Sequence, residues 1–143
     1  MPTLLGTRVE NRQFVYPQHA NNHGTVHGGQ VMRWMDEGGA MAAIRFAGKP
    51  CVTASVDGLD FHHPVPVGQI LVVEAYVYDT GRTSMSVHLR ADRENPRTGE
   101  RERTTESDFV FVAVGEDGKP TPVPDLTVET DEGEALRADA RGE

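Results

Sequence analysis

One long helical segment constrains the fold of this chain more than any other feature. It lies within Asn21–Phe46, NNHGTVHGGQVMRWMDEGGAMAAIRF. From Gly28 onward, one helix face recurs at steps of three and four residues: Val31, Trp34, Met35, Gly38, Met41, Ala42 and Arg45. The pattern predicts a helix that begins at Thr25 or at the Gly28-Gly29 pair and ends at Gly48, shortly before Pro50.

The other structured segments have the alternation or the β-branched composition of strands. We expect strands within Thr3–Tyr16, Cys51–Phe61, Ile70–Tyr78, Ser84–Asp92 and Arg103–Val114. The turn sequence DTGR joins the third and fourth of these into a hairpin. One helix and strands connected mainly by tight turns predict an α+β domain, with an antiparallel sheet packed on the helix.

The length and the charge of the chain limit its class. Its 143 residues, 37% of them hydrophobic and 25% charged, suit one globular domain. We expect this domain over residues 1–124, followed over 125–143 by an acidic tail that is flexible or forms a short frayed helix. The net charge of −8 leaves no basic stripe for nucleic acid or for an anionic membrane. The N-terminal sequence lacks the pattern of a secretory leader, and no run reaches the ~20 apolar residues of a membrane span, so we expect a cytoplasmic location.

Several chemistries are disfavoured because their motifs are missing. The sequence has no G-x-S-x-G elbow, no G-x-x-x-x-G-K-[ST] loop, no dinucleotide fingerprint and no H-E-x-x-H zinc motif. The single cysteine, Cys51, excludes an intrachain disulfide and is expected to fill the core. His19, His23 and His27 recur every four residues, but Asn and Gly between them disfavour a helix, so no metal site is predicted.

Asp36 is the carboxylate with the most favourable setting for chemistry. At ~100° per residue, it projects beside small helix residues such as Gly39 and Ala43, over which a bulky group can pack. Arg33 and Glu37 project in a neighbouring direction and are expected to form an i,i+4 ion pair. The alternative is that Asp36 is an ordinary solvated helix charge.

The start of the helix offers the complementary group. Backbone N–H groups of the first turn have no partner within the helix and carry the positive end of its dipole. Gly28 and Gly29 can therefore donate to an oxygen that becomes negative during acyl transfer, and the amide of Asn21 can hold a carbonyl or a water. Gly28 and Asp36 are ~12 Å apart along a helix, so both reach one carbonyl carbon only from two subunits of an antiparallel dimer.

Four blocks of sequence, in order, resemble one family. They are HANNHGTVHGGQVMRWMDEGGAMAA, PCVTASVDGLDFHHPVPVGQ, TGRTSM and FVFVAVGEDGKPTPVP, and the similarity runs from about Val9 to Pro124. They are similar to the hotdog-fold acyl-CoA thioesterases, in the branch typified by YciA and the brown-fat-inducible thioesterases. The resemblance implies an antiparallel sheet wrapped around the long helix, a homodimer with a continuous sheet, and further assembly into tetramers or hexamers.

The resemblance also implies catalytic roles. Asp36 matches the helix acid that acts as general base or nucleophile, and Gly28 matches the helix-start N–H that polarises the thioester carbonyl. Asn21 matches a residue that orients the carbonyl or the water. Thr25 stands where some relatives carry Asp or Asn, so no additional polar role is carried over to it.

A second set of residues is matched to coenzyme A. Arg82, Thr83 and Ser84 correspond to a family segment near its nucleotide and pantetheine. The alternative for Thr83 and Ser84 is that they only cap a hairpin turn. His27 and Gly29, beside the helix start, complete the expected substrate-binding residues.

The expected reaction is hydrolysis of an acyl-CoA to a free acid and coenzyme A, with no metal or redox cofactor. One alternative is a hotdog hydratase or dehydratase, which uses a catalytic His with an acid. His63-Pro64 is compatible with that alternative, whereas the H-G-G…D helix pattern is not. Another alternative is a non-catalytic acyl-CoA sensor. The preferred acyl group stays open, because a pocket built from two subunits leaves no length signal in one sequence.

Overall fold

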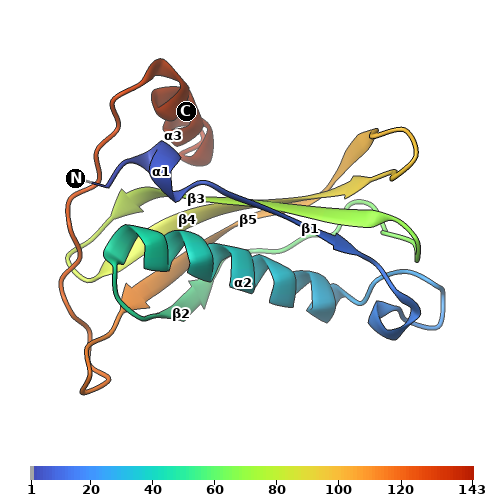
Figure 1. Ribbon diagram of the computed structural model, residues 1–143, viewed down its shortest axis with the longest axis horizontal. Helices are drawn as coiled ribbons and strands as arrows, with labels where there is room; N and C mark the ends of the chain where they lie inside the picture. The colour runs from blue at the N-terminus through green and yellow to red at the C-terminus, as the bar shows by residue number, and fades with distance from the viewer. Residues whose placement is uncertain (1) are drawn as a thin grey trace.

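Helix α2 (Gly28–Ala47) is the central element of the computed structural model, which describes residues 2–143. It lies across one face of a five-stranded sheet (Figure 1). Gly48 closes the helix in the left-handed conformation, with φ of 65°, which a residue without a Cβ adopts at little cost. The predicted end of the helix is thereby confirmed. No described helix is long and apolar enough to cross a membrane.

The sheet is antiparallel throughout, with the strand order β1-β3-β4-β5-β2. Its strands are β1 (Val9–Phe14), β2 (Cys51–Val56), β3 (Ile70–Thr80), β4 (Ser84–Glu94) and β5 (Arg101–Ala113). The predicted hairpin is β3–β4. β1 and β2 are the edge strands, and each pairs along one side only within the described chain. A long helix wrapped by an antiparallel sheet is the hotdog fold that the sequence predicts.

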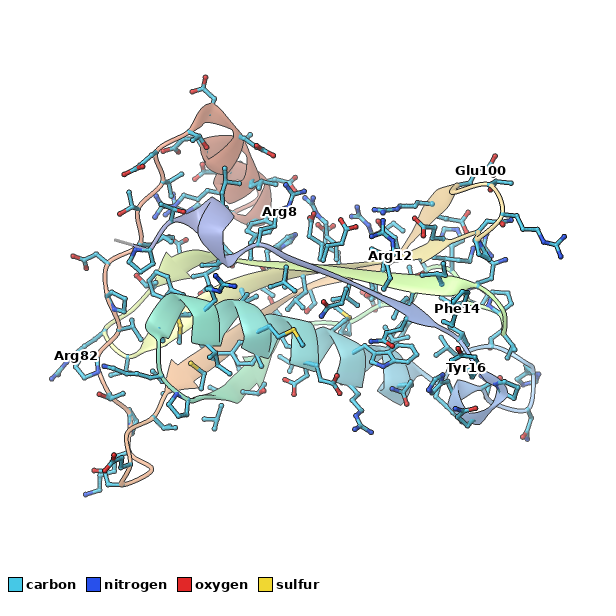
Figure 2. All side chains as sticks on the ribbon, viewed as in Figure 1. Arg8, Arg12, Phe14, Tyr16, Arg82 and Glu100 are labelled. Carbon is cyan, nitrogen blue, oxygen red and sulfur yellow. The ribbon has the colours of Figure 1, made fainter. Side chains whose placement is uncertain are left out.

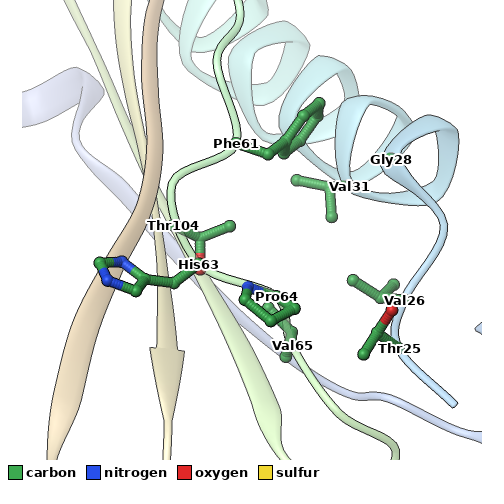
Figure 3. A pocket seen from close by; sticks show the side chains of 9 residues that line it. All are labelled: Thr25, Val26, Gly28, Val31, Phe61, His63, Pro64, Val65 and Thr104. Carbon is green, nitrogen blue, oxygen red and sulfur yellow. The ribbon is translucent and has the colours of Figure 1, made fainter. Parts of the chain in front are cut away.

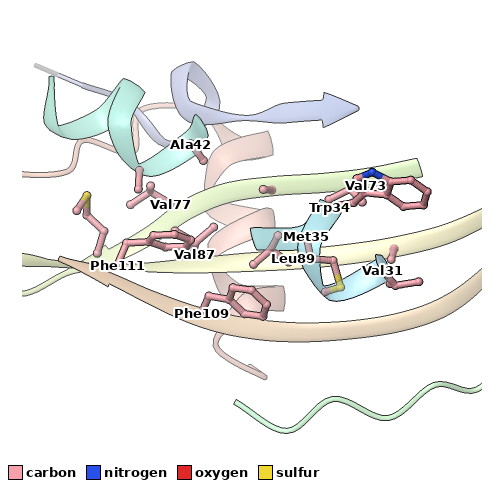
Figure 4. Close-up of a cluster of buried hydrophobic side chains, with 14 of the residues drawn as sticks. Val31, Trp34, Met35, Ala42, Val73, Val77, Val87, Leu89, Phe109 and Phe111 are labelled. Carbon is pink, nitrogen blue, oxygen red and sulfur yellow. The ribbon is translucent and has the colours of Figure 1, made fainter. Parts of the chain in front are cut away.

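The core lies between α2 and the sheet face that looks toward it (Figure 4). Alternate residues of β4 supply that face, as a period of two requires: Met85, Val87, Leu89 and Ala91. Gly39 of α2 lies so close to the ring of Phe111 that a Cβ at this position would be 2.8 Å from it. The small-residue face beside Asp36 is therefore partly covered by an aromatic side chain of the same chain.

Two predicted segments and one predicted core residue differ in the structure. Residues 3–16 are not one strand, because Thr3 caps a short helix α1 (Leu4–Thr7) before β1, and a 3₁₀ turn η1 (Pro17–His19) follows the strand. β2 ends at Val56, and residues 57–66 form an irregular loop that is hydrogen-bonded to β5. Met41 was predicted to face the core but is 49% exposed. The buried face of α2 is formed by residues such as Met35, Ala42 and Phe46.

The acidic C-terminal segment was predicted over 125–143 as a flexible tail or a short frayed helix. It contains the ten-residue helix α3 (Asp131–Ala140), whose start is capped by the side chain of Thr130, so the helix alternative is the one that the structure shows. Arg137 and Arg141 of this segment both pair with Asp79 of β3. The first of these pairs joins residues 58 positions apart in sequence, so composition alone gave no sign of it. Figure 1 shows α3 beside α1, away from α2.

Candidate active site

The loop before α2 is ordered by Asn21. Its Oδ1 accepts hydrogen bonds from the backbone N–H of His23 at 2.9 Å and from the N–H and the hydroxyl of Thr25, each at 3.2 Å. His27, the last loop residue, donates its N–H to the carbonyl of His19 at 2.9 Å, and its side chain is exposed. The amide oxygen of Asn21 is thus committed to the loop, and its NH₂ group is the part left for a ligand.

The first turn of α2 presents free N–H groups. Those of Gly28 and Gly29 have no hydrogen-bond partner in the described chain, and both residues are exposed. Because they lie at the positive end of a 20-residue helix, they can stabilise a negative oxygen. A cavity of about 290 Å³ opens beside this turn (Figure 3), and its lining is Thr25, Val26, Gly28, Val31, Phe61, His63, Pro64, Val65 and Thr104.

Asp36 lies on the α2 face that looks toward β2. The hydroxyl of Thr53 donates to Asp36 Oδ1 at 2.5 Å. Arg33 and Glu37 form the predicted i,i+4 pair, at 3.1 Å, so this arginine is engaged away from Asp36. A second cavity, of about 400 Å³, opens beside the carboxylate and is lined by Gly29, Met32, Arg33, Asp36, Thr53, Val56 and Phe109.

Thr53 is a site residue that the sequence analysis missed. It is 17 positions from Asp36, and the two meet because β2 folds back beside α2. The β2–β5 register is irregular between Thr53 and Ser55, and such an irregularity re-aims side chains. The sequence shows only two hydroxyl residues in a short strand, which does not reveal which of them reaches the helix.

Gly28 and Asp36 face different cavities of the same chain. Eight residues of helix separate them by ~12 Å along the axis. Gly29 does border the Asp36 cavity, but seven helical residues still place it ~10 Å away. The two groups can act on one carbonyl only if a second chain supplies one of them.

The predicted coenzyme A residues lie at the other end of α2. Arg82, Thr83 and Ser84 form the tip of the β3–β4 hairpin, and Arg82 is at the edge of the molecule, exposed (Figure 2). The carbonyl of Thr83 accepts from the N–H of Ala113 at 3.0 Å, and Ala113 pairs with Cys51, which follows the end of α2. The three residues line neither of the two cavities described above.

Within residues 2–143, one cluster holds three potential metal ligands, namely His88, Glu106 and Asp139. Arg90 already lies among them, because its guanidinium donates to Glu106 at 2.9 Å and pairs with Asp139. The guanidinium of Arg90 thus already balances the charge of these carboxylates, and no metal site is inferred there.

The Asp36 cavity opens on an apolar, unpaired part of the surface. Met32 and Val56 border it and are 40% and 43% exposed. The outer edge of β2 has no strand partner in the described chain. Exposed apolar side chains beside an open strand edge are typical of a surface that another chain covers.

Comparison with known families assigns the chain. The family model described as the thioesterase superfamily matches residues 23–100. This chain belongs to the thioesterase superfamily. Curated relatives in this superfamily match most of the length of the chain. It is 37% identical over 126 residues to an acyl-CoA thioester hydrolase, YkhA, of Bacillus subtilis, covering 88% of this chain and 73% of that protein.

Other members of the superfamily support the predicted branch. The acyl-CoA thioester hydrolase YciA of Salmonella typhimurium is 36% identical over 116 residues, covering 79% of this chain and 87% of its own length. Among solved structures, an apo-hexameric acyl-CoA thioesterase has a TM-score of 0.89 and 40% identity, with coverage of 99% and 92%. The family resemblance inferred from the sequence is confirmed.

A Staphylococcus aureus acyl-CoA hydrolase, solved with butyryl coenzyme A and coenzyme A, has a TM-score of 0.88 and 31% identity. The match covers 98% of this thioesterase-superfamily chain and 85% of that protein. Further structures of the same hydrolase carry Ala in place of one Asn, one Asp or one Thr. The three replaced residues are fifteen and seventeen positions apart, which is also the spacing of Asn21, Asp36 and Thr53 here.

Proposed function

We propose that this protein hydrolyses acyl-CoA thioesters to a free carboxylic acid and coenzyme A. The observation that carries the proposal is the Asp36–Thr53 hydrogen bond beside a cavity that opens between α2 and β2. Superfamily membership and relatives named acyl-CoA thioester hydrolases support the same reaction. The Asn, Asp and Thr replaced in the S. aureus hydrolase have the spacing of the three residues that order this site.

Asp36 supplies the base or the nucleophile. With Thr53 holding Oδ1, the second carboxylate oxygen is free to take a proton from water or to attack the carbonyl carbon directly. In the first case the water oxygen bonds to the carbonyl carbon, the C–S bond breaks, and coenzyme A leaves with a proton. In the second case Asp36 bonds to the carbonyl carbon, the C–S bond breaks, and coenzyme A leaves as a thiolate that takes up a proton. Water then hydrolyses the resulting anhydride to the free acid and the Asp36 carboxylate.

Gly28 supplies the group that stabilises the developing charge. Its N–H has no partner in the described chain and lies at the positive end of α2. A backbone N–H aimed at the carbonyl oxygen stabilises the negative charge of the tetrahedral intermediate. Asn21 contributes by shaping the loop that leads to Gly28, and its NH₂ group can contact the carbonyl or the water.

The complete site combines two subunits of a homodimer. Met32 lies midway between Gly28 and Asp36 along α2, and its side chain is 40% exposed. A two-fold axis beside Met32, with the two helices antiparallel, brings the Asp36 of one chain to the Gly28 of the other. The open edge of β2 can then pair with its copy and make the sheet continuous. A relative solved as a hexamer supports further assembly of such dimers.

The same arrangement gives the hairpin tip a role. With the axis at Met32, the C-terminal half of each α2 extends past the start of the other, and its end lies ~16 Å beyond the partner's Gly28 along the axis. Arg82, Thr83 and Ser84 of one chain then lie on the side toward which an extended coenzyme A can run from the thioester. We assign Arg82 to a phosphate of coenzyme A, with Thr83 and Ser84 beside it. His27 and Gly29 at the partner's helix start lie on the other side of the thioester.

Free-thiol release from a panel of acyl-CoA substrates tests the reaction. Turnover supports the hydrolase, and its rate should be linear in enzyme without added metal or redox cofactor. Saturable binding with no thiol release would favour a sensor, and hydration of an enoyl-CoA would favour a hydratase. Light scattering at assay concentration should give a dimer or a multiple of it.

Subunit exchange tests the composite site. An Asp36→Asn chain is mixed with a Gly28→Pro chain, in which the donating N–H is lost at a helix position that tolerates proline. Each parent homodimer should be nearly inactive. In a heterodimer one site is intact and the other carries both lesions, so activity should return toward half of wild type. Verified heterodimers that stay as inactive as their parents would show that the two residues do not cooperate across the interface.

A further inference from the structure

The loop of residues 57–66 is fastened to its neighbours at several points. The N–H groups of Asp57 and His62 donate to carbonyls of β5 at 3.0 and 2.8 Å. Farther along the loop, the carbonyl of Val65 accepts from the N–H of Val26 at 2.8 Å, which ties the loop to the segment that leads into α2. Residues 58–61 therefore lie between two anchored points, beside the start of the helix.

Phe61 uses this placement to contact the first turn of α2. Its ring is 45% exposed, and its nearest carbons lie 3.4 and 3.5 Å from where a Cβ on Gly28 would be, which is van der Waals contact. Figure 3 shows the ring pointing toward this turn, with Val31 beside it. Leu59, two residues earlier in the loop, packs instead against the buried core. Of these two loop residues, Phe61 is the one that borders the Gly28 cavity.

The wall that Phe61 helps to form suits an acyl chain. Val26, Val31 and Val65 line the same cavity and are 9% exposed or less, and none of the lining residues is Lys, Arg, Asp or Glu. The amide groups of pantetheine would lose hydrogen bonds against such walls, whereas an acyl chain has none to lose. The cavity is open on one side, so its final volume depends on what the partner subunit adds. The ring of Phe61 is a wall that this chain supplies.

The N–H of Gly28 limits where the first carbon of the acyl chain can lie. If a carbonyl oxygen accepts from this N–H at ~2.9 Å, the α-carbon, two bonds farther, lies within ~5.3 Å of the nitrogen. The nearest carbon of the Phe61 ring is no more than ~6 Å from the same nitrogen, because a Cβ lies ~2.5 Å from the nitrogen of its own residue. An acyl chain that enters this cavity from the carbonyl therefore passes beside the ring.

We infer that Phe61 determines specificity at the acyl α-carbon: straight-chain acyl groups pass the ring, and groups with a methyl branch at this carbon collide with it. The inference rests on the proposed thioesterase function and on Gly28 as the donor to the carbonyl. The loop backbone is anchored on both sides of Phe61, and turning the ring outward would expose apolar surface that now contacts α2. Extra volume at this point is therefore destabilising.

Three isomeric substrates isolate the position of the branch. Pentanoyl-CoA, 2-methylbutanoyl-CoA and 3-methylbutanoyl-CoA have the same number of acyl carbons, and kcat/KM for each is measured by free-thiol release. Wild type should disfavour 2-methylbutanoyl-CoA by about 10-fold or more relative to the other two. If the substrate panel favours another chain length, the straight, 2-methyl and 3-methyl isomers of that length replace these.

Variants separate the effect of the ring from intrinsic reactivity. A branch at the α-carbon also slows hydrolysis chemically, but that contribution to the preference is the same for every variant. Phe61→Ala removes the wall and should reduce the preference against 2-methylbutanoyl-CoA about 10-fold, and Phe61→Leu should reduce it about 3-fold. Leu59→Ala is the matched control, because Leu59 belongs to the same loop but lines neither cavity, and it should leave the preference unchanged. Circular dichroism checks that each variant is folded.

The outcomes distinguish this inference from the proposed function. A preference that is equal in wild type and both Phe61 variants, or that shifts equally in Leu59→Ala, overturns the role of Phe61, while thiol release leaves the thioesterase function standing. Equal kcat/KM of wild type for all three isomers does the same. Absence of thiol release by wild type from these and every other acyl-CoA of the panel would instead refute the proposed function itself.

Discussion

The two faces of the sheet are built on different principles. The inner face packs on α2 through apolar side chains that form the buried core. The outer face carries a network of charges, and α3 and its neighbours pack on that side. Tyr76 marks the contrast, because it lies on the outer face between the core residues Ala75 and Val77, and its hydroxyl donates to the carbonyl of Leu136 in α3 at 2.9 Å.

Polar groups of the outer face are paired with one another. His88 is 5% exposed, and its two ring nitrogens lie 2.9 Å from Asp108 and 2.6 Å from Glu106. Burial alone would lower the pKa of His88, but the hydrogen bonds to the two carboxylates outweigh it, so the pKa is raised. For Tyr76, whose charged form is the anion, burial instead raises the pKa, to about 12.

Polar groups at the start of α2 and in β5 are left unpaired. The N–H groups of Gly28 and Gly29 lack partners in the described chain, and so do the buried hydroxyls of Thr104 and Thr105. An unpaired buried hydroxyl costs stability, whereas the exposed N–H groups of Gly28 and Gly29 can bind water until a ligand replaces it. The difference between the faces indicates that ion pairs fasten the outer layer, while hydrogen-bonding capacity is reserved for a ligand at the helix start.

The largest expected effect lies on the inner side, at Asp36. Asp36→Asn removes the base or nucleophile but keeps the shape of the side chain. We expect kcat to fall by ~10²- to 10⁴-fold, the usual scale for loss of a catalytic base, with the fold retained. Steady-state thiol release and circular dichroism measure the two properties.

The control for Asp36→Asn is Glu37→Gln, which alters the exposed pair with Arg33 and should change kcat less than about 2-fold. Near-normal kcat in a folded Asp36→Asn protein would remove Asp36 from the mechanism. The helix start would then be the sole functional part of the inner side.

The next effect concerns the outer face and appears in stability. His88→Gln leaves Asp108 without its cationic partner, so the free energy of unfolding should fall by about 2 kcal/mol near pH 6. Because the folded-state pKa of His88 is raised, its contribution is complete below the unfolded value of about 6.5 and is lost as pH rises through the folded pKa. The deficit of the variant should therefore shrink by pH 9.

Urea unfolding at both pH values measures that deficit, and kcat of His88→Gln at pH 7 should stay within about 2-fold of wild type because the site lies on the other face. If the loss of unfolding free energy in His88→Gln grew with pH, protonated His88 would not be what stabilises the outer face. A large loss of kcat would mean that the two faces are not independent.

The sequence predicted those features that depend on neighbours along the chain. The extent of α2 follows from its apolar spacing and from Gly48, and the Arg33–Glu37 pair follows from i,i+4 geometry. The alternation of β4 placed its apolar residues in the core correctly. It also placed His88 on the opposite face, but alternation alone could not show that this face is covered.

Features that depend on distant segments were missed for a physical reason. Thr53 reaches Asp36 only through the placement of β2 beside α2, and Phe61 reaches the start of α2 only because the loop of residues 57–66 folds over it. α3 depends on Asp79 of β3, whose pKa is held low by Arg141 first and Arg137 second. The composition of the C-terminal segment, which is acidic and poor in aromatics, does not reveal that Asp79 is its partner.

A smaller effect on the inner side is expected at Thr53. Thr53→Val removes the donor to Asp36 Oδ1, so the carboxylate is less well oriented and kcat should fall about 10-fold. Thr53→Ser keeps the hydroxyl and should retain most of the rate. If valine and serine reduce kcat equally, the hydrogen bond is not what matters, and the shape of the side chain at β2 is the relevant property.

The smallest effect is expected at Arg82, which belongs to neither face but to the exposed hairpin tip. If it binds a phosphate of coenzyme A, Arg82→Ala should raise KM about 3- to 10-fold, leave kcat nearly unchanged, and weaken the salt dependence of KM. Arg97→Ala is the matched control, because Arg97 is an exposed arginine in the turn between β4 and β5 and its loss changes the net charge equally. Titration of KM against ionic strength separates the two variants, since a contact at the site steepens the salt dependence whereas a general charge effect is shared by both. Equal KM for Arg82→Ala and wild type at low and high salt would return Arg82, with Thr83 and Ser84, to the role of hairpin turn residues.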